Sequence, residues 1–307
     1  MNRISLIGVG LSSEKGYGTA AAITVSIIWG LSFVAASMVL TTLSPVILAT
    51  VRFIIASAIY APVIIWEYRR GNRPSLADMR ELAAFGFLSI SIYFWLQYTG
   101  VQYAGAGVSA VLVTGLIPVL TGIAGTVLLK ERFDAKKGVG IALGLTGVAL
   151  IAVPKLFIGS VDWLFFAGVV CLLGNAVCWS MYSTLSRRLM KRIGKPLMVT
   201  AYTTIFGMLF LLPMSLTSDW GALSAVTTAQ WGSILYLAVI CSSGGYLLWN
   251  YALSKLEAVK ASVWLYLEPV AAFIGSFALF GQVPAPLTLL GGAAILVGAL
   301  LTSLSKE

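Results

Sequence analysis

Ten long apolar runs, distributed along almost the whole chain, most strongly limit what this sequence can fold into. A helix needs about 20 apolar residues to cross the hydrocarbon core of a bilayer. Each run has roughly that length, and the pattern predicts an all-α integral membrane protein with ten transmembrane helices. The runs cover residues 18–41, 45–67, 80–100, 105–128, 136–154, 162–186, 197–216, 230–253, 259–280 and 286–304.

The composition excludes an ordinary soluble domain. Charged residues make up 10% of the 307 residues and hydrophobic residues 59%, whereas soluble domains have about 25% charged residues. The net charge of +9 does not indicate nucleic-acid binding, because the basic residues form short clusters between the apolar runs. The chain has no histidine and no catalytic constellation, and its three cysteines lie within apolar runs. We therefore expect neither an enzyme nor a bound metal or cofactor.

The basic residues also predict how the chain is threaded. If the N-terminus is cytoplasmic, 18 of the 20 Lys and Arg residues fall in segments on the cytoplasmic side, as the positive-inside rule requires. Of the other two, Lys155 is in an outside loop and Arg52 is within a run. We interpret the first run as a retained span, because residues 1–17 lack a convincing cleavage site. These observations predict a multi-pass protein of a bacterial inner membrane with both termini cytoplasmic.

The second half of the sequence resembles the first half. Five pairs of residues match at a shift of 151, and Trp29 matches Trp179 at a shift of 150. We predict two five-helix repeats, residues 1–155 and 156–307. Because five is odd, the second repeat enters the membrane from the opposite side, as in many secondary transporters. The five pairs are Pro45 with Pro196, Pro62 with Pro213, Pro118 with Pro269, Gly140 with Gly291, and Gly147 with Gly298.

Prolines and glycines within the runs predict bends and close contacts. Pro118 and Pro269 lie near the middle of the fourth and ninth runs, where proline removes a backbone hydrogen bond and kinks a helix. A hinge beside a cavity and a static packing kink are both open. Small residues in the fifth and tenth runs allow close helix contact, and a homodimer through these runs is an open alternative. They are Gly140, Gly144, Gly291, Gly292 and Gly298.

Arg52 and Glu268 are the two ionisable residues well inside the runs. A charge within the membrane is costly and usually faces a cavity or a partner. Glu268 is a candidate site for a proton or for a cationic group of a solute. The alternatives are that Glu268 caps the backbone near Pro269 or pairs with Arg52.

Polar and aromatic residues form stripes at helical spacing on four runs, and we expect these stripes to converge on a central cavity. Hydrogen bonds between helices are the alternative for any single residue. Ser89 and Ser242 begin two of the stripes and Lys260 begins a third. The candidate cavity residues are Tyr93, Gln97, Asn175, Trp179, Tyr182, Tyr246, Asn250, Trp264 and Glu268.

Short motifs give the chain a family resemblance. They are Trp29-Gly30, Arg52-Phe53, Lys130-Glu131-Arg132 and Leu267-Glu268-Pro269-Val270. On these motifs the chain resembles the EamA-type carriers of the drug/metabolite transporter superfamily, from about residue 18 to 304. Gly281-Gln282 departs from the usual Gly-Glu, so no role of an acid is carried over to that position. The stretch 94–103, FWLQYTGVQY, resembles that of YddG-type exporters of aromatic amino acids.

The resemblance implies a ten-helix carrier that works by alternating access through a central cavity and exports aromatic and other neutral amino acids. The partners would be this small-molecule solute and the lipid bilayer, without nucleic acid. A drug or xenobiotic efflux carrier and a carrier of nucleotide-sugar-like metabolites are alternatives. A channel is disfavoured because no charge ring or filter motif is visible, and no ATP-binding motif is present.

Overall fold

The computed structural model describes residues 4–129, 135–152, 162–256, 258–281, 283 and 285–303. Throughout these residues the chain forms helices and turns, without a β-strand. Each of the ten apolar runs coincides with one helix or with a series of consecutive helices. The predicted all-α fold with ten membrane spans is confirmed.

The first five spans follow one another from α1 to α6. The third span is interrupted by a π-helix, η1, between α3 and α4. The elements are α1 (Ile4–Val39), α2 (Pro45–Arg69), α3 (Leu76–Gly86), η1 (Phe87–Ile92), α4 (Tyr93–Ala104), α5 (Ala106–Leu129) and α6 (Ala135–Ala152).

The second five spans run from α8 to α14. Here the eighth span contains the π-helix η3, and the ninth contains the 3₁₀-helix η4. The elements are α8 (Trp163–Ile193), α9 (Pro196–Ser215), η2 (Trp220–Ala225), α10 (Thr228–Leu235), η3 (Tyr236–Gly245), α11 (Tyr246–Lys255), α12 (Ala258–Ser262), η4 (Val263–Tyr266), α13 (Leu267–Phe280) and α14 (Pro286–Ser303).

Length and hydropathy agree with a membrane location. Among the described residues, six helical segments are long and apolar enough to span a bilayer, and three shorter apolar segments lie in the fourth, ninth and tenth spans. Large apolar side chains such as Leu209, Ile274 and Phe277 are exposed on the outside of the bundle. Lipid, rather than water, is the medium that would cover such a surface.

Local signals at several helix ends explain where the spans begin and stop. Ser44 precedes Pro45 at the start of α2 and its side chain accepts a backbone hydrogen bond. Ser75 and Asp78 form a capping box at the start of α3. Gly194 ends α8 with a φ of 72°, a left-handed conformation that glycine adopts without steric cost.

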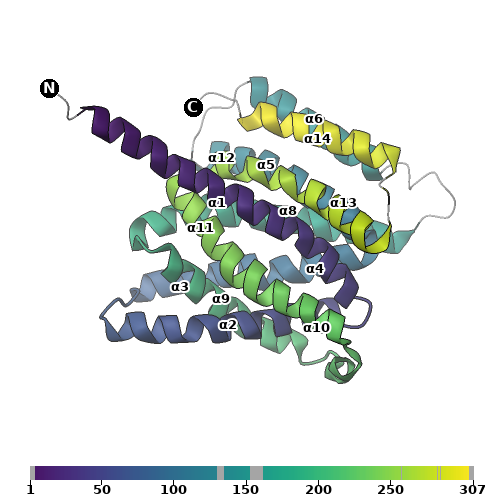
Figure 1. The fold of residues 1–307 in the computed structure, drawn as a ribbon, viewed down its shortest axis with the longest axis horizontal. Helices are drawn as coiled ribbons and strands as arrows, with labels where there is room; N and C mark the ends of the chain where they lie inside the picture. Colours follow the sequence, from purple (N-terminus) through teal and green to yellow (C-terminus); the bar gives the residue numbers. More distant parts are fainter. Residues whose placement is uncertain are drawn as a thin grey trace.

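The main contacts of a helix in one half match those of its equivalent helix in the other half. In the first half α1 contacts α13 and α11, and in the second half α8 contacts the matching helices α5 and α4. The pairs α2 with α9 and α6 with α14 each join equivalent helices of the two halves. Figure 1 shows α6 and α14 side by side at one edge of the bundle. This exchange symmetry is what an inverted repeat produces.

The symmetry extends to single residues at the closest helix crossings. A Cβ added at Gly30 in α1 would lie 2.5 Å from the carbonyl oxygen of Glu268. In the other half, the hydroxyl of Ser180 in α8 donates to the carbonyl of Ile117 at 3.1 Å. Glu268 and Ile117 are the residues before Pro269 and Pro118. The same crossing is therefore tight in one half and bridged by a hydroxyl in the other.

The two π-helices lie at equivalent places in the third and eighth spans. A π-helix is wider than an α-helix, occurs mostly as a short interruption, and is frequent at functional sites. The indole N–H of Trp29 donates to the carbonyl of Cys241 in η3 at 3.0 Å. The hydroxyl of Tyr246 donates to the carbonyl of Ser89 in η1 at 2.9 Å. Both π-helices thus present carbonyl groups to side chains from the opposite repeat.

Candidate functional site

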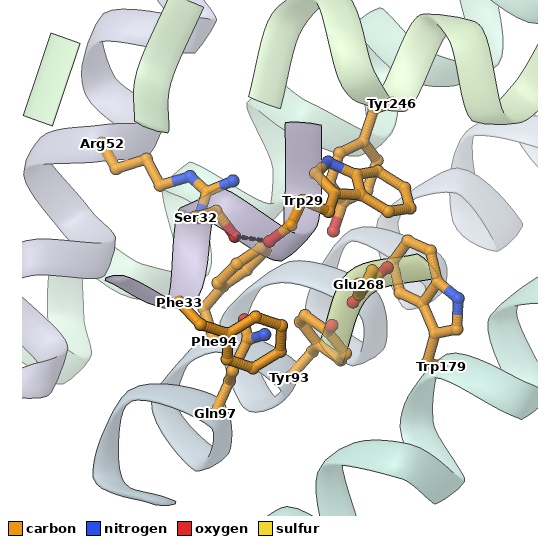
Figure 2. Close-up of a pocket in the computed structure, with 10 residues that line it drawn as sticks. All are labelled: Trp29, Ser32, Phe33, Arg52, Tyr93, Phe94, Gln97, Trp179, Tyr246 and Glu268. Atoms are coloured by element: carbon orange, nitrogen blue, oxygen red, sulfur yellow. Dashed lines mark hydrogen bonds between the residues drawn. The ribbon is translucent and has the colours of Figure 1, made fainter. Parts of the chain in front are cut away.

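A small cavity lies in the centre of the bundle, between the two repeats (Figure 2). Helices α1, α2, α4, α8, α11 and α13 all contribute to its wall. Its free volume is about 20 Å³, enough for about one water molecule and far below the roughly 300–1,000 Å³ of a typical ligand pocket. Side chains therefore fill most of the space between the repeats at this point. The lining residues are Trp29, Ser32, Phe33, Arg52, Tyr93, Phe94, Gln97, Trp179, Tyr246 and Glu268.

Aromatic rings make up most of the cavity wall. Trp29 and Trp179, which match in the repeat, meet edge to face with ring centroids 5.1 Å apart and planes at 87°. Tyr246 contacts both indoles at 5.7 and 5.6 Å, and Tyr93 contacts Trp179 at 5.1 Å. Such contacts give rigid, flat walls that suit a flat or amphipathic solute.

Arg52 extends from α2 into the cavity and is 2% exposed. Its Nε donates to the hydroxyl of Ser242 and its Nη1 to the hydroxyl of Tyr98, both at 2.6 Å. The guanidinium carbon also lies 4.3 Å from the centre of the Phe94 ring, within range of a cation–π interaction. These neutral partners fix the position of the guanidinium without neutralising its charge.

Glu268 lines the same cavity from the first turn of α13 and is 5% exposed. Among the described residues, no hydrogen bond or ion pair reaches its carboxylate, and Arg52 in particular is not its ion-pair partner. Of the alternatives drawn from the sequence, the Arg52 pair is thus absent from this conformation. In Figure 2 the carboxylate lies near Trp29, Tyr93 and Trp179.

Five of the nine candidate cavity residues line the cavity: Tyr93, Gln97, Trp179, Tyr246 and Glu268. The other four lie elsewhere in the bundle. The hydroxyl of Tyr182 donates to Asn250, which in turn donates to Thr200 at 2.7 Å. Asn175 donates to the carbonyl of Tyr93 at 2.8 Å. Trp264 packs beside Ala21 and Ala22 of α1.

The structure describes the surroundings of one of the two candidate hinge prolines. Pro269 is buried and occupies the first turn of α13, directly after η4. Proline has no backbone N–H and cannot donate a hydrogen bond to the preceding turn. The break in the ninth span is therefore a change from 3₁₀- to α-helix. Pro118 falls within α5, but its side chain lies outside the described part of the chain.

Several lining residues were missed by the stripe pattern, although some signals for them existed. Trp29 is the repeat mate of the candidate Trp179, and Arg52 was recognised as a charge within a span. Phe94 adjoins Tyr93 in sequence and also reaches the cavity. No simple pattern distinguishes Phe33 from the many apolar residues of α1.

Polar contacts join the two repeats at both ends of the bundle. At the basic end, Arg192 pairs with Asp78 at 2.7 Å and with Glu81, and Lys195 pairs with Glu67 at 2.9 Å. At the opposite end, the amide of Gln230 donates to the carbonyl of Met38 and to the hydroxyls of Thr41 and Thr42 at 2.8–3.1 Å.

Two similar helical repeats, threaded in opposite directions around a shared cavity, define a multi-pass membrane transporter for small solutes. The model of the EamA-like transporter family matches residues 16–153 and 166–304. The chain belongs to this family, as its motifs suggested. Each matched segment contains five of the ten spans.

Known proteins and a solved structure agree with this assignment. The chain is 30% identical over 273 residues to an uncharacterized transporter of Archaeoglobus fulgidus, covering 88% of this chain and 92% of the relative. It is 31% identical over 230 residues to a probable terminal-alkyne amino-acid exporter of Streptantibioticus cattleyicolor, covering 75% of each. One crystal structure shares the fold with a TM-score of 0.66 at 21% identity, covering 93% of this chain and 96% of that chain.

Proposed function

We propose that this protein exports aromatic and other neutral amino acids across a bacterial inner membrane by alternating access. The observation that supports this most directly is the aromatic cavity enclosed by both repeats, with Trp29 against Trp179 at its centre. Flat apolar walls with a few polar groups suit an amino acid with a large side chain. The amino-acid exporter among the relatives supports the same class of cargo.

In this proposal the two repeats, residues 1–155 and 156–307, tilt against each other about the cavity. The contacts of Arg192 at one end and of Gln230 at the other would open in turn. Pro269 and Pro118 would mark the bends of the ninth and fourth spans. The excess of basic residues at the Arg192 end supports cytoplasmic termini. Neither an enzymatic step nor a cofactor is part of the proposal.

The test is uptake of labelled L-phenylalanine, L-tryptophan and L-leucine into proteoliposomes that contain the purified protein, with and without a pH gradient. Saturable uptake and counterflow of at least one of these amino acids is expected. Uptake that rises with the gradient would identify coupling to protons. Flux that does not saturate would instead indicate a channel, and no uptake of any amino acid would refute the proposed cargo.

One observation favours a second candidate, efflux of cationic drugs. Glu268 places a carboxyl group among aromatic rings, and a flat cation could bind to both. Ethidium in the same proteoliposomes distinguishes the two candidates. Saturable ethidium transport without amino-acid transport would favour the second.

A further inference from the structure

A basic and an acidic side chain line one cavity without pairing with each other. Arg52 is 2% and Glu268 5% exposed, and no ion pair joins them among the described residues. A buried charge without a countercharge costs several kcal/mol. Both groups line a space of about 20 Å³, so both lie beside the place that a solute must enter.

The Arg52 guanidinium is held in place but keeps donors free. It has five N–H groups, and the two hydrogen bonds to Ser242 and Tyr98 use two of them. Tyr98 belongs to the first repeat and Ser242 to the second, so both repeats orient the guanidinium. A planar guanidinium with free N–H groups binds a carboxylate better than any other side chain.

The Glu268 carboxylate complements Arg52 on the other side of the rings. It lies directly before Pro269, where α13 continues from η4. Its lone pairs have no donor among the described residues. Figure 2 shows the two side chains entering from different helices, with Phe94, Trp29 and Tyr93 drawn around the space between them.

We propose that Arg52 and Glu268 together select a zwitterion: Arg52 binds the carboxylate of an amino acid and Glu268 its ammonium group, while the aromatic wall accepts the side chain. The proposal rests on the amino-acid function proposed above and specifies how the cargo is recognised. A zwitterion supplies both countercharges at once. An amine or a carboxylic acid of the same shape leaves one membrane charge unpaired, and this disfavours its binding.

Three molecules that share a phenyl ring and chain provide the test. L-Phenylalanine carries both charges, phenethylamine carries the ammonium group alone, and 3-phenylpropionate the carboxylate alone. Each competes with labelled L-phenylalanine in proteoliposomes. In the wild type we expect L-phenylalanine to compete at least tenfold better than either analogue.

Substitutions then separate the two charges. Glu268→Gln should reduce the preference for L-phenylalanine over 3-phenylpropionate at least fivefold, because the ammonium site is lost. Arg52→Gln should reduce the preference for L-phenylalanine over phenethylamine at least fivefold, because the carboxylate site is lost. If Arg52→Gln fails to fold, Arg52→Lys keeps the charge but loses the planar fork, and should weaken competition by L-phenylalanine and 3-phenylpropionate alike. Asp219→Asn, in the loop before η2, is the control and should leave all preferences unchanged.

The outcomes distinguish this proposal from the function on which it depends. Transport of L-phenylalanine with equal competition by all three molecules overturns the zwitterion site and leaves amino-acid transport intact. The zwitterion site is also overturned if Glu268→Gln changes the response to a pH gradient but leaves the relative competition by the three molecules unchanged. Absence of uptake of L-phenylalanine, L-tryptophan and L-leucine by the folded wild type refutes both proposals.

Discussion

Trp29 and Trp179 match in the repeat but differ in how their indole N–H groups are satisfied. Trp29 donates to the carbonyl of Cys241, whereas the N–H of Trp179 is buried without a partner in the described part of the chain. Loss of a buried hydrogen bond that leaves a carbonyl unpaired costs about 1–3 kcal/mol. The first tryptophan therefore stabilises the fold by a hydrogen bond that the second lacks.

This difference predicts unequal effects of the same substitution. Trp29→Phe should lower the thermal unfolding temperature of the detergent-solubilised protein more than Trp179→Phe, because both lose similar ring area but only the first loses a hydrogen bond. Trp179→Phe should mainly reduce transport of L-tryptophan. Equal unfolding temperatures for the two variants would contradict the assignment.

Gln97 and Asn250 occupy equivalent places, each four residues after the first residue of α4 and of α11. Asn250 is fully buried and bonds to Tyr182 and Thr200, while the Gln97 amide lines the cavity and has no hydrogen bond among the described residues. Asn250→Ala leaves the Tyr182 hydroxyl unpaired and should cost about 1–3 kcal/mol of stability. Gln97→Ala should retain the unfolding temperature within about 1 °C and lower the apparent affinity for the cargo. Thermal melts of both variants, with transport measured in parallel, check the prediction.

The sequence located part of the cavity for a physical reason. Helical spacing shows which residues share a face of one span, as it did for Tyr93 and Gln97. It does not show which neighbouring helix that face meets. Whether Asn250 faces the cavity or bonds to Tyr182 and Thr200 depends on the crossing of α11 with α8 and α9, which periodicity cannot supply.

At the level of elements, the crossing of α1 and α13 positions Glu268. A Cβ at Gly30 would lie 2.5 Å from the Glu268 carbonyl oxygen and 2.6 Å from the Ala271 Cβ. Gly30→Ala must therefore push the two helices apart. Gly16, in the same helix, has no atom within 4 Å of an added Cβ.

Gly30→Ala should lower the unfolding temperature and shift the charge that Glu268 presents to the cavity, so transport should fall at least tenfold. Gly16→Ala is the matched control and should be neutral or stabilising by up to about 1 kcal/mol, since alanine is favoured over glycine within a helix. Thermal melts and uptake assays measure both effects. Wild-type transport by Gly30→Ala would show that the crossing tolerates displacement.

The helical elements also show why the fold was easier to predict than its irregularities. Hydropathy over about 20 residues identifies a span because the bilayer has a fixed thickness. It is insensitive to whether the backbone within the span is α-, π- or 3₁₀-helical. The interruptions η1, η3 and η4 were accordingly missed, although they provide the carbonyls of Ser89 and Cys241 that the other repeat uses.

For the whole molecule, the Arg192 contacts at the basic end suit a transport cycle because they are exposed and therefore weak. Arg192 is 46% exposed and Glu81 51%, and ion pairs of such exposure contribute about 0–1 kcal/mol. The contacts join α3 of the first repeat to α8 of the second. Thermal motion can break them, so they limit the orientation of the repeats without fixing it.

A reversible link between these two positions tests whether the repeats must separate there. Glu81→Cys combined with Arg192→Cys, joined by a bifunctional methanethiosulfonate reagent, should lose transport, and reduction should restore it. The exposed pair should react first, because Cys178 and Cys241 are buried and Cys171 is half-buried. Glu81→Cys alone and Arg192→Cys alone, treated with the same reagent, are expected to remain active. This result excludes an effect of labelling alone. Full transport by the protein whose cross-link is verified by mass would mean that this end stays closed throughout the cycle, and alternating access about the Arg192 contacts would then be wrong.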